Sequence, residues 1–190
     1  MIIRGDRLKQ FAAEAGVSRE QLAQAVERVG LKGPNAMKAV SNWMDGRELG
    51  ACRASDISKL AQAVGCQVRD LALFRSQVRH HRGSPRKARL LADLVRGKNV
   101  DEALNLLKFT TKRAAVNIRK ALAAAIADAE QAEADVTTLY VAESRVDNGP
   151  SMKRFNQKDR GRAHPILKRF SHITIGVQER TANSKKKGRR

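Results

Sequence analysis

Two strand-like segments flank a long basic connection in the last third of the chain, and this arrangement constrains the fold more than any other feature. Residues 139–146 read as one strand, and Ile173, Ile175 and Val177 alternate with smaller residues in a second strand. The connection between them, about residues 147–166, is strongly basic and contains several Gly and Pro residues. A connection of this length inside a compact domain is usually functional. We therefore expect an extended two-stranded arm, rooted in the two strands, that binds a polyanion.

Three helical patterns precede this region. Ser84 and Pro85 begin the first, and Gly97 ends it. The second covers residues 100–109, and the longest covers about residues 112–132. Apolar residues on one face of the longest helix follow the helical repeat: Ala115, Ile118, Leu122, Ala125, Ile126 and Ala129. Residues 75–83 are basic without this periodicity, and they form either a linker or a strand of a later sheet.

The N-terminal part reads as a bundle of five short helices joined by Gly-containing turns. The first covers residues 6–15, and the second follows Ser18, which has Gln21 at a capping-box spacing. Leu22, Ala25, Val26 and Val29 continue the second helix. The third begins at Pro34 and ends near Met44, Ser55 caps the fourth, and the fifth covers about residues 68–74. Five such helices are typical of a small bundle that contains a helix-turn-helix.

The net charge of +19 indicates a nucleic-acid partner. The charge is uneven, because residues 1–78 carry a net +4 and residues 79–190 a net +15. The polyanion site is therefore expected mainly in the second part. The last residues, 184–190, hold five Lys or Arg and are expected to form a disordered arm.

Enzyme, metal and membrane functions receive little support from the sequence. The chain has no phosphate-cradling Gly-Lys-Ser/Thr loop and no metal-spaced His/Glu cluster, so neither catalysis nor a cofactor is expected. Cys52 and Cys66 lack ligand spacing and are expected to be buried thiols in a reducing compartment. The N-terminal residues are charged where a signal peptide needs an apolar core, and no run approaches a membrane span. We expect a cytoplasmic protein.

Several motifs, in order, resemble the L-twenty-two family of large-subunit ribosomal proteins over about residues 76–179. The opening helix of the family is similar to SPRKARLLADLVRGK (84–98), and its second helix to ALNLLKF (103–109). The most specific likeness is VDNGPSMKRF (146–155), followed by GRA (161–163) and KRFSHIT (168–174). Departures from the family pattern are Asp128, the less basic 157–160 segment, and His164-Pro165.

This resemblance implies an α+β fold with three helices on a small three-stranded antiparallel sheet and a long protruding β-hairpin. It implies binding to large-subunit rRNA and neighbouring ribosomal proteins, and a role in subunit assembly. It also implies a hairpin tip that lines the nascent-peptide exit tunnel. The expected domains are 1–76, helical; 77–180, ribosomal; and 181–190, a basic disordered tail.

Candidate rRNA-binding residues are mostly cations, which neutralise phosphates, and Arg can also stack on bases. They are Arg79, Arg82, Ser84, Arg86, Lys87, Arg89, Lys98, Lys112, Arg113, Arg119, Lys120, Lys153, Arg154, Lys158, Arg160, Arg162, Lys168, Arg169 and His172. The candidate tunnel-facing residues of the hairpin are Met152, Phe155, Asn156, Gln157 and Gly161.

The N-terminal bundle resembles phage-repressor-type helix-turn-helix domains. The likeness lies in GVSREQLA (16–23), VSNWMDGR (40–47) and LAQAVGC (60–66), with a longer connection between the second and third helices. The resemblance implies that the third helix enters the DNA major groove. The candidate DNA-binding residues are Asn35, Lys38, Ser41, Asn42 and Arg47, whereas Trp43 is expected in the core. Two alternatives stay open for this domain: a sequence-specific DNA-binding regulator, or an extra contact to rRNA or protein.

Overall fold

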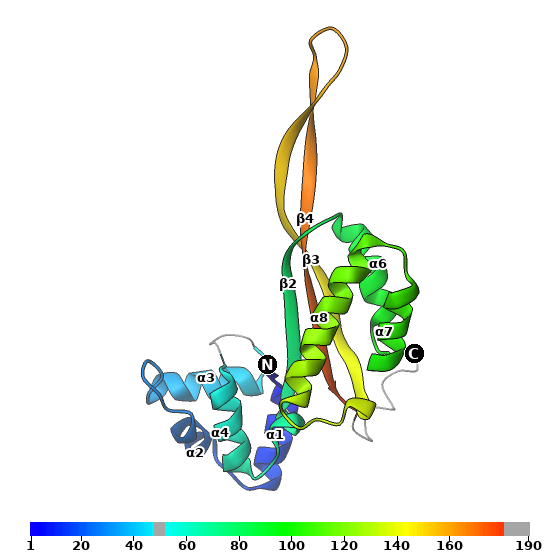
Figure 1. Ribbon diagram of the computed structural model, residues 1–190. Helices are drawn as coiled ribbons and strands as arrows, with labels where there is room; N and C mark the ends of the chain where they lie inside the picture. The colour runs from blue at the N-terminus through cyan, green and yellow to red at the C-terminus, as the bar shows by residue number, and fades with distance from the viewer. Residues whose placement is uncertain (48–51, 181–190) are drawn as a thin grey trace. The chain divides into compact units, whose positions relative to one another are not determined.

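The computed structural model describes residues 1–47 and 52–180, and it divides the chain into two compact units (Figure 1). The first unit contains Met1–Phe74 together with Asp128–Ala134. The second contains Arg75–Ala127 and the described residues from Asp135 to Arg180. The tail expected at residues 181–190 lies outside the described residues.

The first unit is mainly helical. Its elements are β1 (Ile2–Ile3), α1 (Gly5–Glu14), α2 (Arg19–Ala25), α3 (Pro34–Met44), α4 (Ala54–Val64) and α5 (Val68–Leu71). Helix α2 packs against α3 and α4, and α1 packs against α3 and α5. The buried residues at the centre include Leu8, Leu22, Val40, Trp43, Ile57, Leu60 and Leu71. The prediction that Trp43 belongs to the core is confirmed.

The N-terminal caps of two helices in this unit show when the local sequence predicts a helix start correctly and when it does not. Ser18 begins α2 with the predicted capping box, since its hydroxyl accepts the Gln21 N–H at 3.3 Å and the Gln21 side chain accepts the Ser18 N–H at 2.9 Å. The predicted cap of α4 is wrong. Arg53 is the N-cap, and its backbone N–H donates to the carboxylate of Asp56 at 3.0 Å. Ser55 lies one residue inside the helix.

Two further expectations for this part of the chain are corrected. Helix α2 ends at Ala25, and Val29 is 93% exposed rather than part of an apolar face. The fifth helix ends at Leu71, because Ala72 and Leu73 pair with Ile3 and Ile2 of β1. Phe74 is therefore a fully buried strand residue and not the end of a helix. The β1 pairing links the two ends of the unit's sequence, and no local pattern predicted it.

The second unit combines helices with antiparallel strands. Its elements are β2 (Ala72–Arg82), α6 (Pro85–Val95), α7 (Val100–Phe109), α8 (Arg113–Glu130), a 3₁₀ turn (Val136–Thr138), β3 (Leu139–Gln157) and β4 (Ala163–Glu179). The strand order is β1-β2-β4-β3, so the sheet has four strands among the described residues and not the expected three. Residues 75–82 belong to strand β2 and not to a linker. Together with the helices, these antiparallel strands give the expected α+β fold.

The core of the second unit lies between the helices and the root of the β3–β4 pair. Helix α6 contacts both strands and α7 contacts β3. The part of the predicted apolar face of α8 that lies in this unit is buried, from Ala115 and Ile118 to Ile126. On the sheet, the buried residues include Leu139, Val141, Val146, Ile173, Ile175 and Val177. This packing fixes the part of β3 and β4 from which the basic arm extends.

Candidate nucleic-acid interface

The β3–β4 hairpin continues far beyond the helices that cover its root (Figure 1). The pairing is antiparallel from Leu139 opposite Glu179 to Gln157 opposite Ala163, with irregularities near Ala142 and between Asn148 and Ser151. Both predicted strands are therefore longer than the sequence suggested, and the connection is a paired ribbon. Residues 150–165 are all exposed. Each strand pairs its inward-facing backbone groups with the other strand, and the outward-facing groups of the exposed ribbon are open to solvent, so the ribbon can project without a core of its own.

A tight turn closes the hairpin. Arg160 and Gly161 have positive φ angles of 54° and 72°, as a type I′ turn requires. The Arg162 N–H donates to the Asp159 carbonyl at 3.2 Å, and the Lys158 N–H donates to the Arg162 carbonyl at 2.8 Å. The turn therefore presents Lys158, Arg160 and Arg162 within one short segment. Along the ribbon, Met152 is 48% and Phe155 78% exposed.

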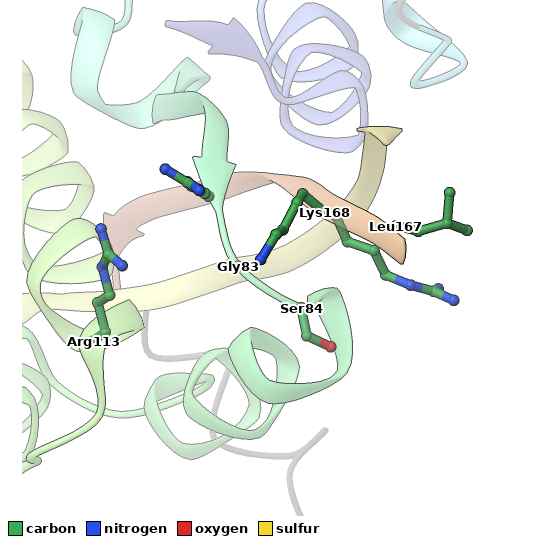
Figure 2. Close-up of a pocket in the computed structure, with 7 residues that line it drawn as sticks. Gly83, Ser84, Arg113, Leu167 and Lys168 are labelled. Atoms are coloured by element: carbon green, nitrogen blue, oxygen red, sulfur yellow. The ribbon is translucent and has the colours of Figure 1, made fainter. Parts of the chain in front are cut away.

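A basic cavity lies at the foot of the hairpin, with a volume of about 540 Å³. Figure 2 shows Gly83 and Ser84 between Arg113 at the start of α8 and Lys168 on β4. Ser84 is the N-cap of α6, and its side chain makes no capping hydrogen bond. The cavity brings together five predicted rRNA-binding residues from four elements, and no acidic residue lines it: Arg82, Ser84, Arg113, Lys168 and Arg169. Cations converging at this density form a site for phosphate groups.

A second cavity, of about 630 Å³, adjoins the first and shares Arg82, Gly83, Ser84 and Arg113 with it. We call it the Leu90 cavity. Its further lining combines the apolar residues Leu90, Ala88 and Ala114 with the basic residues Lys87 and Lys112. Leu90 is 61% exposed although it is a large aliphatic residue. The sequence carries no signal for the apolar part of this site, because Leu90 reads as an ordinary residue of an amphipathic helix.

His81 forms one wall of the Leu90 cavity and is only 6% exposed. Its Nδ1 atom lies 2.5 Å from the side-chain nitrogen of Asn117 on α8. Burial lowers the pKa of His81 from its ordinary value, and the nearby Arg113 charge lowers it further. The imidazole is therefore kept neutral.

His80 and His172 form a second histidine contact. The backbone N–H of His80, which has a φ of 57°, donates to Nδ1 of His172 at 3.1 Å. The two rings meet edge to face with centroids 4.8 Å apart. One nitrogen of His172, a predicted rRNA-binding residue, is thus occupied in joining β2 to β4. Its Nε2 atom faces Gly149 and would lie 3.2 Å from a Cβ atom there.

The other predicted rRNA-binding residues fall into two groups. Some cations bind the protein itself: Arg89 donates to the Val146 carbonyl at 3.2 Å, and Lys98 pairs with Glu102. These contacts hold α6 to β3 and support the start of α7. The rest have exposed side chains on β2, the helices and the hairpin: Arg79, Arg86, Lys87, Lys112, Arg119, Lys120, Lys153 and Arg154.

Acidic residues on β3 pair with neighbouring cations. Glu143 binds Arg75 at 2.8 Å and lies 3.4 Å from Nε of Arg145. Arg145 also contacts Asp147 at 3.4 Å. Arg96 donates twice to the Ser144 carbonyl, so β3 is fixed to the end of α6. These groups stabilise the fold, and the excess of positive charge remains on the hairpin and around the two cavities.

The candidate DNA-binding residues of the first unit lie on or just after α3. Asn35, Lys38 and Arg47 are exposed, whereas Ser41 and Asn42 are half-buried. Met37 on the same helix is 45% exposed. The exposed face of α3 is therefore polar with one basic side chain and one large apolar side chain.

The two cysteines are free thiols of intermediate exposure, so the expectation that both are buried is only partly correct. Burial, together with the Asp56 charge, raises the pKa of Cys52 to about 12. Burial also raises the pKa of Cys66. Within residues 1–47 and 52–180, no His, Cys, Asp and Glu residues gather in a group of three that could hold a metal. No helix in these ranges is long and apolar enough to span a membrane.

A paired basic ribbon, rooted in an α/β core beside two cation-lined cavities, defines a nucleic-acid-binding protein. The profile of the family described as Ribosomal protein L22p/L17e matches residues 76–178, and the chain belongs to this family. It is therefore a structural constituent of the large ribosomal subunit that binds rRNA and ribosomal proteins in the cytoplasm. Proteins of this family are generally not enzymes. The match confirms the resemblance drawn from the motifs at residues 84–98, 103–109 and 146–174.

Proposed function

We propose that the β3–β4 hairpin lines the nascent-peptide exit tunnel of the large subunit. The observation that carries this proposal is a two-stranded ribbon whose residues 150–165 are all exposed and whose tip presents Lys158, Arg160 and Arg162. Such a ribbon buries no core of its own, so its exposed groups are available to rRNA phosphates on one side and to a passing chain on the other. Met152, Phe155, Asn156, Gln157 and Gly161 are the residues proposed to face the nascent peptide.

The rRNA contact proposed for the rest of the second unit centres on the two cavities. Arg82, Ser84, Arg113, Lys168 and Arg169 bind phosphates at the foot of the hairpin. The exposed cations of β2, α6 and α8 extend this contact. Because the contacts join helices and both hairpin strands to the RNA, the protein aids assembly by holding rRNA segments together. In this proposal the ribosomal domain covers residues 77–180 and a separate domain covers residues 1–76.

The N-terminal domain is proposed to make an extra contact of its own, with rRNA or a neighbouring protein. The modest net charge of +4 over residues 1–78 favours this over a DNA-binding function. A sequence-specific regulator is the second candidate. It is supported by the exposure of Asn35, Lys38 and Arg47 on or next to α3. Binding of residues 1–76 to duplex DNA with a defined sequence preference would favour the regulator.

The experiment that tests the main proposal is cryo-electron microscopy of large subunits that contain this chain. Density for the hairpin along the tunnel wall, with Arg82 and Lys168 against rRNA phosphates, is the expected result. A hairpin that points away from the tunnel would contradict the tunnel assignment. Density for residues 1–76 against rRNA or protein would support the extra contact.

A further inference from the structure

We infer that the Leu90 cavity receives the base of one unstacked nucleotide of the bound rRNA, while the adjoining basic cavity binds its phosphate. This inference rests on the proposal that these residues contact rRNA, and it adds the recognition of a single nucleotide to that proposal.

The first observation is the chemical division of the two adjoining cavities. The basic cavity is lined by guanidinium, ammonium and hydroxyl groups, with Leu167 at its edge. The Leu90 cavity adds apolar lining from Leu90, Ala88 and Ala114, of which Leu90 is the one with a largely exposed side chain. A nucleotide has the same division, since its phosphate is anionic and the face of its base is apolar. Unpaired bases that leave the stack are the parts of RNA that proteins recognise most readily.

The second observation is the size and shape of the Leu90 cavity. Its volume of about 630 Å³ lies within the range of small-molecule sites, about 300–1,000 Å³. Phosphate contacts alone need only a charged surface and no apolar wall. Leu90 is 61% exposed, so most of this aliphatic side chain lies outside the protein's own core. A base packed on Leu90 would bury this side chain.

The third observation is the buried imidazole of His81. Asn117 donates its side-chain N–H to Nδ1, which leaves the proton of the neutral ring on Nε2. No further partner of Nε2 is found among the described residues, and the ring is a wall of the cavity. Gly83 allows this position, because a Cβ atom there would lie 2.7 Å from Nε2. The cavity thus offers one neutral donor to a carbonyl or ring nitrogen on the edge of a base.

Electrostatics also favours a nucleotide over an apolar peptide segment. The residues that line the two cavities include Lys87, Lys112, Arg113 and Lys168, and none of the lining residues is acidic. An apolar segment that covered Leu90 would leave these cations beside it without counter-charges. A nucleotide within an RNA strand supplies a base for the apolar wall and phosphates for the cations on both sides of it.

The test compares two exposed leucines of α6 in the full-length chain. Leu90 lines the cavity, whereas Leu94, which is 40% exposed, does not. Binding to purified large-subunit rRNA is measured across a series of salt concentrations for Leu90→Ala and for the matched control Leu94→Ala. We expect Leu90→Ala to weaken binding about tenfold at every salt concentration, because it removes apolar contact and no phosphate contact. Leu94→Ala should bind as the parent chain does.

Equal affinities of the two variants would overturn the inference. A separate variant, Lys168→Ala, tests the underlying proposal that these residues bind rRNA phosphates. Lys168→Ala should reduce the slope of log affinity against log salt by about one, as the loss of one phosphate contact requires. An unchanged slope would contradict the phosphate site, whatever the leucine variants do. A third measurement adds free adenosine or uridine monophosphate as a competitor for the bound rRNA. If either displaced the rRNA at micromolar concentration, the cavity would belong to a soluble nucleotide and the inference would fail.

Discussion

The buried His81 on β2 and the half-buried Asn117 on α8 form a side-chain pair, with 2.5 Å between the imidazole Nδ1 and the amide nitrogen. The pair joins the strand that precedes the basic cavity to the helix that supplies Arg113. The pair stabilises the fold only when the imidazole is neutral. A protonated ring would place the Nδ1–H donor against the amide donor of Asn117 and a positive charge beside Arg113. This gives the second unit a defined dependence on pH.

We expect the free energy of unfolding of the second unit to fall as the pH is lowered below about 6.5. The folded state lowers the pKa of His81, so between that lowered value and 6.5 the unfolded chain binds more protons than the folded chain. The part of the free energy of unfolding that His81 contributes is therefore fully present above pH 6.5. It is lost as the pH falls toward the pKa of His81 in the folded protein. Urea unfolding followed by far-ultraviolet circular dichroism at pH 7.5 and pH 5 measures it.

His81→Gln should remove this part of the pH dependence, because the amide of glutamine does not titrate. The control is His164→Gln, which changes an exposed histidine of the hairpin and should leave the pH dependence as it is. The same loss of stability at pH 5 in His81→Gln as in the parent chain would show that another group is responsible.

Gly5→Ala should destabilise the first unit by about 2–3 kcal/mol, a typical cost of overpacking. A Cβ atom on Gly5 would lie 2.4 Å from the carbonyl oxygens of Trp43 and Met44, and the backbone at the end of α3 cannot move aside without breaking its contacts. Trp43 fluorescence during denaturation reports this loss directly. Gln10→Ala on the exposed side of α1 is the control. Equal midpoints for the two variants would contradict the close packing of α1 on α3.

Replacement of Lys153, Arg154, Arg160 and Arg162 by alanine should impair late assembly of the large subunit without unfolding the isolated chain. All four side chains are exposed on the hairpin, so they contribute little to the core. Sucrose-gradient profiles and chemical protection of the rRNA test the first part, and circular dichroism tests the second. A normal subunit profile with unchanged protection would exclude the proposed role of the hairpin.

Cys52 should react with iodoacetamide far more slowly at pH 8 than a free thiol does. Burial and the charge of Asp56 raise its pKa to about 12, so only about one molecule in ten thousand carries the reactive thiolate at this pH. Alkylation rates of Cys66→Ser between pH 7 and 10 isolate Cys52. A rate that levels off near pH 9 would show an ordinary thiol pKa.

Local patterns predicted the helices well and their ends less well. The predicted helix at residues 100–109 matches α7, and Pro34 begins α3 as expected, since propensity and caps act within one turn. The capping of α4 was assigned to Ser55 because a hydroxyl residue is a common cap. The backbone instead uses Arg53, with Asp56 accepting its N–H.

The candidate site was predictable as a set of charges and not as a shape. The basic residues of the hairpin and of residues 84–89 stand out because nothing else in a cytoplasmic chain explains their density. Leu90, Gly83 and Asn117 carry no such signal. Leu90 and Gly83 line a cavity together with Lys112 and Arg113, which lie more than twenty positions away, and Asn117 contacts His81 of the same cavity.

The sequence by itself determined the helical segments, the strand patterns around residues 139–177, the polyanion partner and the family. Periodicity, caps and charge are properties of neighbouring residues, and the family motifs are read in order along the chain. The tertiary structure decided the length of the paired hairpin, the pairing of β1 with β2, and the two adjoining cavities at the hairpin's foot. Each depends on contacts between distant residues, whose energies are set by burial and register that no local window contains.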